Sequence, residues 1–115
     1  TRAVHDTCET LSTTSADAID AVNAYVKAHN EDSAEIDVTL GPAVDGLNQS
    51  AEAVQASITD IVPDELKDVF TKWIDGARST ADVISKNAAP AEFNKAVDDL
   101  NLARSDALRV CDATY

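Results

Sequence analysis

The sequence contains no methionine, three glycines, three prolines and five aromatic residues among its 115 positions. Glycine and proline supply most tight turns, so their scarcity argues against a β-sandwich or a β-barrel. No apolar run approaches the roughly 20 residues that a membrane-spanning helix requires. Nine Lys and Arg stand against 21 Asp and Glu, which gives a net charge of −12. Because phosphate binding needs clustered basic residues, we expect no nucleic acid partner. Because no apolar run is long enough, we also expect no membrane span.

Alanine, with 20 copies, is abundant, and hydrophobic residues make up 44% of the chain. Alanine has the highest intrinsic helix propensity, so the composition favours helices. The length predicts one domain, residues 1–115, that is large enough to bury a core.

Apolar residues recur at steps of three and four in four segments, which predicts four amphipathic helices. We expect them over about 4–29, over 40–61, from Pro63 through Ile84, and over 90–112. The polar turns between them include a capping pair, Asp32 with Glu35, and residues 87–89. The sequence therefore predicts an all-α protein, an antiparallel up-and-down four-helix bundle.

The second segment has the most regular apolar stripe, with steps that alternate between four and three. Pro42 stands near its beginning, as Pro63 and Pro90 do in the later segments, and proline favours the first helical turn. Whether Pro42 begins this helix or kinks a longer one stays open. The stripe consists of Leu40, Val44, Leu47, Ala51, Val54, Ile58 and Ile61.

Two cysteines, Cys8 and Cys111, fall on the inward stripes of the first and last segments. In an up-and-down bundle both positions lie at the same end, so we expect a disulfide between them. It would close a loop of roughly 100 residues and contribute about 4–5 kcal/mol on the chain-entropy model. The alternative is two buried free thiols.

A disulfide predicts an oxidising compartment, and hence a secreted or cell-envelope protein. Removal of an export signal would explain the missing initiator methionine.

Two small groups of residues are candidates for ligand binding. Tyr25 and His29 are four residues apart on one helical face and are both side-chain types that ligate haem iron. The alternative is that Tyr25 completes the core and His29 ends the helix. Phe70 and Trp73 form the densest aromatic group, which either fills the core or lines an apolar pocket.

Signatures of catalysis and metal binding are missing from the sequence. It has no Glu-x-x-His pair of the kind that di-metal bundles use, and its cysteines and histidines lack zinc-ligand spacing. No Gly-x-Ser-x-Gly elbow surrounds a serine, so we expect no enzyme and no bound metal.

The early Cys8, the late Cys111 with its following Asp-Ala-Thr-Tyr end, and the Ala-, Asp- and Val-rich helices resemble small secreted helical proteins of mycobacteria and related actinobacteria. One such group contains haem carriers with a Tyr-x-x-x-His pair late in the first helix. Those residues would be Tyr25 and His29 here. That group uses a further histidine in a later helix, whereas this sequence has none after residue 29.

These observations predict a non-enzymatic secreted or envelope protein that acts as an interaction module or binds a small apolar ligand. Its partner would be a protein or that ligand. Two alternatives remain: a haem carrier that uses Tyr25 and His29, and an accessory subunit of an envelope complex.

Overall fold

A computed structural model describes residues 2–31, 34–86 and 90–114 of the chain. It contains four helices, α1 (Arg2–Asn30), α2 (Ile36–Ser57), α3 (Asp64–Ser85) and α4 (Pro90–Thr114), and no strand among the described residues. The predicted all-α, antiparallel up-and-down bundle is therefore confirmed. Asp32 and the turn at 87–89 lie outside the described residues.

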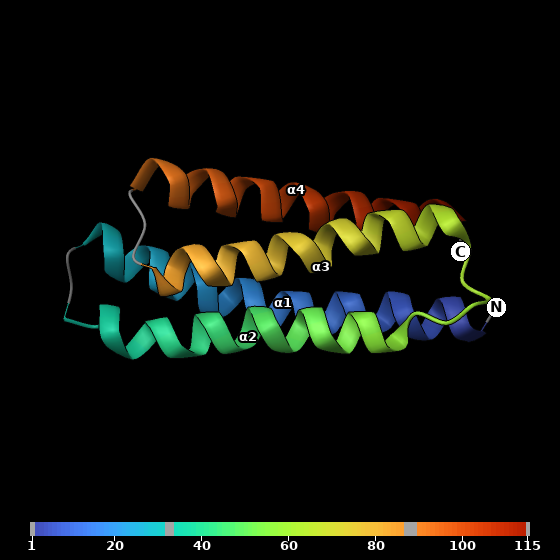
Figure 1. Ribbon diagram of the computed structural model, residues 1–115, viewed down its shortest axis with the longest axis horizontal. Helices are drawn as coiled ribbons and strands as arrows, with labels where there is room; N and C mark the ends of the chain where they lie inside the picture. The colour runs from blue at the N-terminus through green and yellow to red at the C-terminus, as the bar shows by residue number, and fades with distance from the viewer. Residues whose placement is uncertain (1, 32–33, 87–89, 115) are drawn as a thin grey trace.

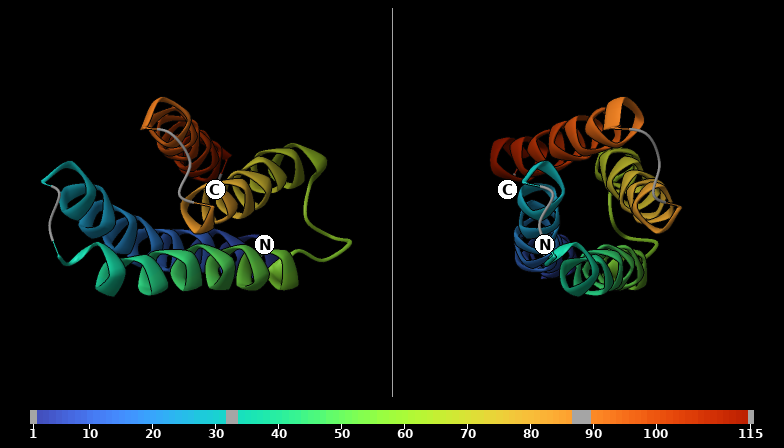
Figure 2. Two further views of the ribbon diagram at one scale, coloured as in Figure 1. Left: turned by 60° about the vertical axis from the view of Figure 1, so that its left-hand side comes forward. Right: turned by 90° about the vertical axis from the view of Figure 1, so that its left-hand side faces the viewer.

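The helices run side by side in alternating directions, so α1 begins and α4 ends at the same end of the molecule (Figure 1). The bundle measures 46 × 21 × 20 Å. Viewed along its length, each helix has two neighbours, and α1 and α3 are not adjacent (Figure 2). α1 packs most closely with α2, and α1 and α4 pack against each other least among the neighbouring pairs.

The core follows the apolar stripes, because each helix turns one face inward. Residues of all four helices form one hydrophobic cluster, whose largest fully buried side chains include Trp73, Tyr25 and Phe70. Hydroxyl residues share these inward positions, since Thr7, Ser15, Ser50 and Thr80 are also buried. The interior is therefore built from apolar side chains with a set of internal hydrogen bonds.

The sequence left open whether Pro42 begins its helix, and in the structure Pro42 lies inside α2. The helix begins earlier, at Ile36, so Pro42 falls in its second turn. Pro42 is exposed, and Val38, whose carbonyl would lose its partner, is 72% exposed. A carbonyl on the solvent side can bond to water instead, which explains why the helix tolerates this proline.

The prediction that Ile61 belongs to the inward stripe is wrong, because this side chain is 70% exposed. α2 ends at Ser57, and Ile58 adopts an extended conformation. The chain then turns toward Pro63, which is itself extended and precedes α3. Since the helical periodicity stops at Ser57, the neighbouring Val62 takes the buried place instead.

Candidate functional site

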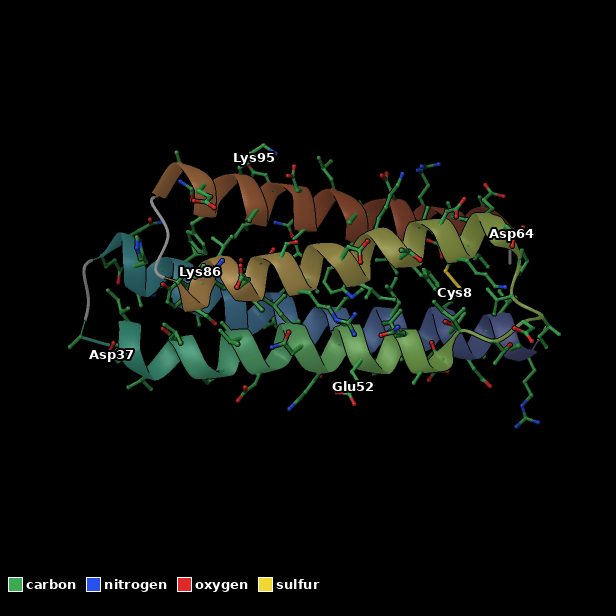
Figure 3. All side chains as sticks on the ribbon, viewed as in Figure 1. Cys8, Asp37, Glu52, Asp64, Lys86 and Lys95 are labelled. Carbon is green, nitrogen blue, oxygen red and sulfur yellow. A yellow bond between two sulfur atoms is a disulfide. The ribbon has the colours of Figure 1, made fainter. Side chains whose placement is uncertain are left out.

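The two cysteines form the predicted disulfide between the first and last helices. Cys8 lies near the start of α1 and Cys111 near the end of α4, with their Cα atoms 6.1 Å apart. The sulfurs meet at the end of the bundle where α1 begins (Figure 3). The bond closes a loop with a sequence separation of 103 residues, and it leaves no free cysteine. This pair is structural, because neither sulfur remains as a nucleophile.

Further side-chain contacts bridge α1 and α4. Arg104 Nε donates a hydrogen bond to Ser15 Oγ at 2.6 Å, in the middle of the seam. Farther from the disulfide, the ring of Phe93 meets that of Tyr25 edge to face, with centroids 5.5 Å apart. These helices pack loosely, so discrete bridges rather than continuous contact hold them together.

Tyr25 and His29 do lie together, as their spacing predicted. Their ring centroids are 5.9 Å apart, and Phe93 lies 5.7 Å from His29, so the three rings form one cluster. Tyr25 is only 2% exposed, and this burial raises the pKa of its phenol. A tyrosine binds iron as phenolate, so a raised pKa opposes ligation in this conformation. The cluster closes the bundle between α1 and α4.

Trp73 and Phe70 are both fully buried and have no ring contact with that cluster in the described part of the chain. Trp73 Nε1 donates a hydrogen bond to Ser50 Oγ at 3.0 Å. Ser50 Oγ also lies 2.8 Å from Thr14 Oγ1, and Thr14 donates its own proton to the carbonyl of Thr10. Ser50 must therefore be the donor to Thr14.

The result is a directed chain of hydrogen bonds from α3 through α2 to α1. Because it satisfies the indole N–H inside the core, Trp73 has a structural role there. The sequence pattern had assigned the Ser and Thr residues near position 14 no such role. A buried Trp does require a partner, and Ser50 on the same face as Leu47 and Val54 was the available signal.

Small and hydroxyl side chains line the seam between α1 and α2, and the hollow beside Gly46 holds only about 80 Å³. Thr7 donates to Ser57 Oγ at 2.6 Å, since Ser57 gives its own proton to the carbonyl of Val54. At Gly46, a Cβ atom would lie 3.4 Å from the Cα of Ala18. The backbones approach each other so closely here that little space remains between the helices.

A hollow of about 260 Å³, lined by Asn48 and Arg78 among others, lies over the seam between α2 and α3. The seam between α3 and α4 is more open, and two larger hollows lie along it. One, of about 280 Å³, is lined by α3 residues between Gly76 and Val83 and by α4 residues between Glu92 and Asp99. The other, of about 350 Å³, is lined by α3 residues between Lys72 and Gly76 and by α4 residues between Asp99 and Asp106. Both hollows include Gly76 and Asp99, so they are two parts of one groove, which we call the α3–α4 groove.

None of the sequence-predicted ligand residues lines the α3–α4 groove. No periodic signal could have found this groove, because it depends on the distance between two helices and on the small size of Gly76. Within the described residues, no group of three or more His, Cys, Asp and Glu side chains is placed to hold a metal ion. In the same part of the chain, no helix combines the length and apolarity needed to cross a membrane.

Comparison with known proteins places this architecture in a defined group. Residues 1–112 match the family described as the Rv2240c four-helix bundle domain. An uncharacterized protein of Mycobacterium tuberculosis (strain CDC 1551 / Oshkosh), MT2300, is 42% identical over all 115 residues. The chain spans 58% of the length of that curated relative. No solved structure matches the chain. The resemblance to mycobacterial helical-bundle proteins is confirmed, whereas the haem-carrier likeness stays a prediction.

Proposed function

The chain belongs to the Rv2240c four-helix bundle family, and we propose that it is a non-enzymatic interaction module that binds a protein partner outside the cytosol. One observation carries this proposal. The polar groups of the interior bond to one another, whereas the two largest of the hollows described lie on the surface between α3 and α4.

The state of the interior favours a binding surface over an internal ligand. Trp73, Phe70 and Leu47 are fully buried in the shared cluster. Every buried side-chain nitrogen or oxygen among the described residues has a hydrogen-bond partner. A site that binds a small molecule would present unpaired polar groups toward a cavity to orient it. The interior polar groups here are already engaged.

The disulfide supports a location in the envelope or outside the cell. A bond between Cys8 and Cys111 persists in oxidising compartments and is rare in the reducing cytosol. The net charge of −12 keeps such a protein soluble and disfavours anionic surfaces. A cationic region of a protein partner matches this charge.

Native mass spectrometry of the protein purified from its host, without reduction, tests the proposal. We expect the oxidised chain, lighter by two hydrogen atoms, in a complex of defined stoichiometry with another protein. An accessory subunit of an envelope complex would give the same kind of spectrum with several partners. An oxidised chain that carries only a small-molecule adduct, or a bare monomer, contradicts the proposal.

The haem-carrier hypothesis has one favourable observation, the Tyr25–His29 ring pair with its centroids 5.9 Å apart. A carrier must develop a Soret band with stoichiometric haem. Tyr25→Phe keeps the packing against Phe93 and removes the oxygen ligand, so it must abolish that band. A spectrum identical to that of free haem, after haem is added to the native protein, rejects this alternative.

A further inference from the structure

The α3–α4 groove has the shape that a third helix needs for packing. Its two parts hold about 280 and 350 Å³ and follow the seam between the helices. The lined stretch runs over residues 72–83 of α3 and 92–106 of α4. At 1.5 Å per residue these stretches measure about 17 and 21 Å, or three to four helical turns.

Small residues open the groove, and an exposed leucine marks its edge. Ala96 and Ala103 line it from α4, and at Gly76 a Cβ atom would meet Leu100 Cδ1 at 3.8 Å and nothing closer. Leu102 lines the groove and is 64% exposed. Val38 and Ile61 are exposed to a similar degree, but neither lines a hollow described above. The groove therefore combines concavity with unused apolar surface.

The charges along the groove are mainly negative. Four carboxylates line it against two lysines, and Lys95 is already paired with Asp99 at 3.0 Å. Lys95 points outward from α4 in Figure 3. Among the described residues, no cationic nitrogen lies within 4.0 Å of the carboxylates of Asp75 or Glu92, which stand on opposite sides of the groove. Lys86, at the end of α3, interacts with Glu92 only from beyond that distance. A ligand with cations on both flanks would be attracted there.

We propose that the α3–α4 groove docks a basic amphipathic helix of a protein partner, with an apolar stripe on Gly76 and Leu102 and Lys or Arg toward Asp75 and Glu92. The inference rests on the proposed interaction function and assigns its surface and the chemistry of its partner. It follows the common mode in which a helix lays its apolar face in a groove. A second copy of this chain does not fit, because each copy carries a net charge of −12.

A designed peptide tests the groove directly. The probe is a fluorescent helix of about 18 residues, with leucines at heptad spacing and lysines beside them, which is long enough to cover the groove. A scrambled peptide of the same composition keeps the charge and loses the apolar face. We expect the amphipathic probe to bind at least about tenfold more tightly than the scrambled one, as measured by fluorescence anisotropy. Equal binding of both peptides would reduce the interaction to charge alone and overturn the proposal.

Variants locate the binding. Leu102→Gln and Gly76→Gln change the groove, and Val38→Gln is the matched control on α2 with a similarly exposed side chain. We expect each groove variant to weaken binding of the probe about tenfold, and the control to leave it unchanged. Helical circular dichroism and thermal unfolding confirm that all three variants fold. An equal loss in Val38→Gln, or no loss in either groove variant, overturns the assignment.

The same variants separate the surface from the proposed function. A native complex that persists in Leu102→Gln and Gly76→Gln protein from the host would leave the interaction module standing and reject the groove. The absence of any protein complex from the unaltered chain would instead reject the module. Loss of the complex in both groove variants, with retention in Val38→Gln, is the expected result.

Discussion

The two helix pairs of the bundle differ in how their seams are closed. Between α1 and α2, two short hydroxyl contacts, at 2.6 and 2.8 Å, and the approach at Gly46 leave little space. Between α3 and α4, Thr80 bonds mainly to its own helix, at 2.8 Å, and reaches the carbonyl of Ala96 at 3.4 Å. The α3–α4 groove lies on this second seam. A glycine thus permits close packing in one pair and leaves free space in the other.

The comparison separates structural from functional use of the same residue types. Serine, threonine and glycine between α1 and α2 fix the distance and register of two helices. Between α3 and α4 they leave a surface that a partner can fill. The predictions below therefore act on one pair and use the other as control.

The largest effect is expected where the two pairs are joined at the α1–α4 seam. Replacing Cys8 and Cys111 by alanine removes the covalent tie between loosely packed helices. We expect a loss of about 4 kcal/mol, since the bond closes a long loop. Urea unfolding of the oxidised protein and the double variant measures it. A loss below about 1 kcal/mol would mean that noncovalent packing alone holds α4 to α1.

Replacing each of two glycines by leucine should give the next largest difference in stability. Gly46→Leu forces a side chain between α1 and α2, where even a Cβ atom lies 3.4 Å from Ala18 Cα, and should cost about 3 kcal/mol. Gly76→Leu extends into the α3–α4 groove and should cost nothing, because leucine is a better helix former than glycine. Thermal unfolding compares the two variants. Equal losses of stability would show that the two seams do not differ in the space beside their glycines.

A matched pair of serines tests the interior hydrogen bonds. Ser50→Ala leaves Trp73 Nε1 unpaired in the core and removes the donor to Thr14, so we expect a loss of about 1–2 kcal/mol. Ser79→Ala, at an exposed position in the α3–α4 groove, should change stability by less than about 0.5 kcal/mol. Near-ultraviolet circular dichroism should also report the altered surroundings of Trp73. If both variants are as stable as the native protein, the chain of hydrogen bonds from Trp73 through Ser50 and Thr14 to Thr10 does not stabilise the fold.

The smallest effect concerns pH and the ring cluster that joins α1 to α4. Burial raises the pKa of Tyr25, so the folded state holds the phenolic proton more tightly than the unfolded chain does. This contribution is complete below the ordinary value of 10.0 and is lost as pH rises through the folded pKa. As the pH is raised above 10.0, the free energy of unfolding of Tyr25→Phe should therefore fall less than that of the native chain. Urea unfolding at a series of pH values measures both. Parallel losses would show that Tyr25 ionises as freely as it does in an unfolded chain.

The sequence pattern predicted the fold because each helix carries its own periodic stripe. The inward positions of Leu47, Trp73 and Leu100, and the pairing of Cys8 with Cys111, follow from periodicity and from up-and-down connectivity. The errors arose where periodicity continues past the end of a helix. Ile61 fits the stripe of α2 by number, but the helix ends before it.

The candidate site was less predictable, because it depends on the space between helices. The Tyr25–His29 pair was found from its spacing, while its burial beneath Phe93 required the position of α4. The α3–α4 groove has no sequence signature, since Gly46 and Gly76 are each single helical glycines that differ only in their surroundings. Distances between helices, rather than residue types, distinguish a closed seam from a docking surface.

Amide hydrogen exchange, with and without the basic amphipathic probe peptide, tests the functional difference between the two helix pairs most directly. We predict added protection over residues 72–83 of α3 and 92–106 of α4, with unchanged exchange in α1 and α2. Protection concentrated in α1 and α2, or at the Tyr25 and His29 end of α1, would contradict a docking surface between α3 and α4.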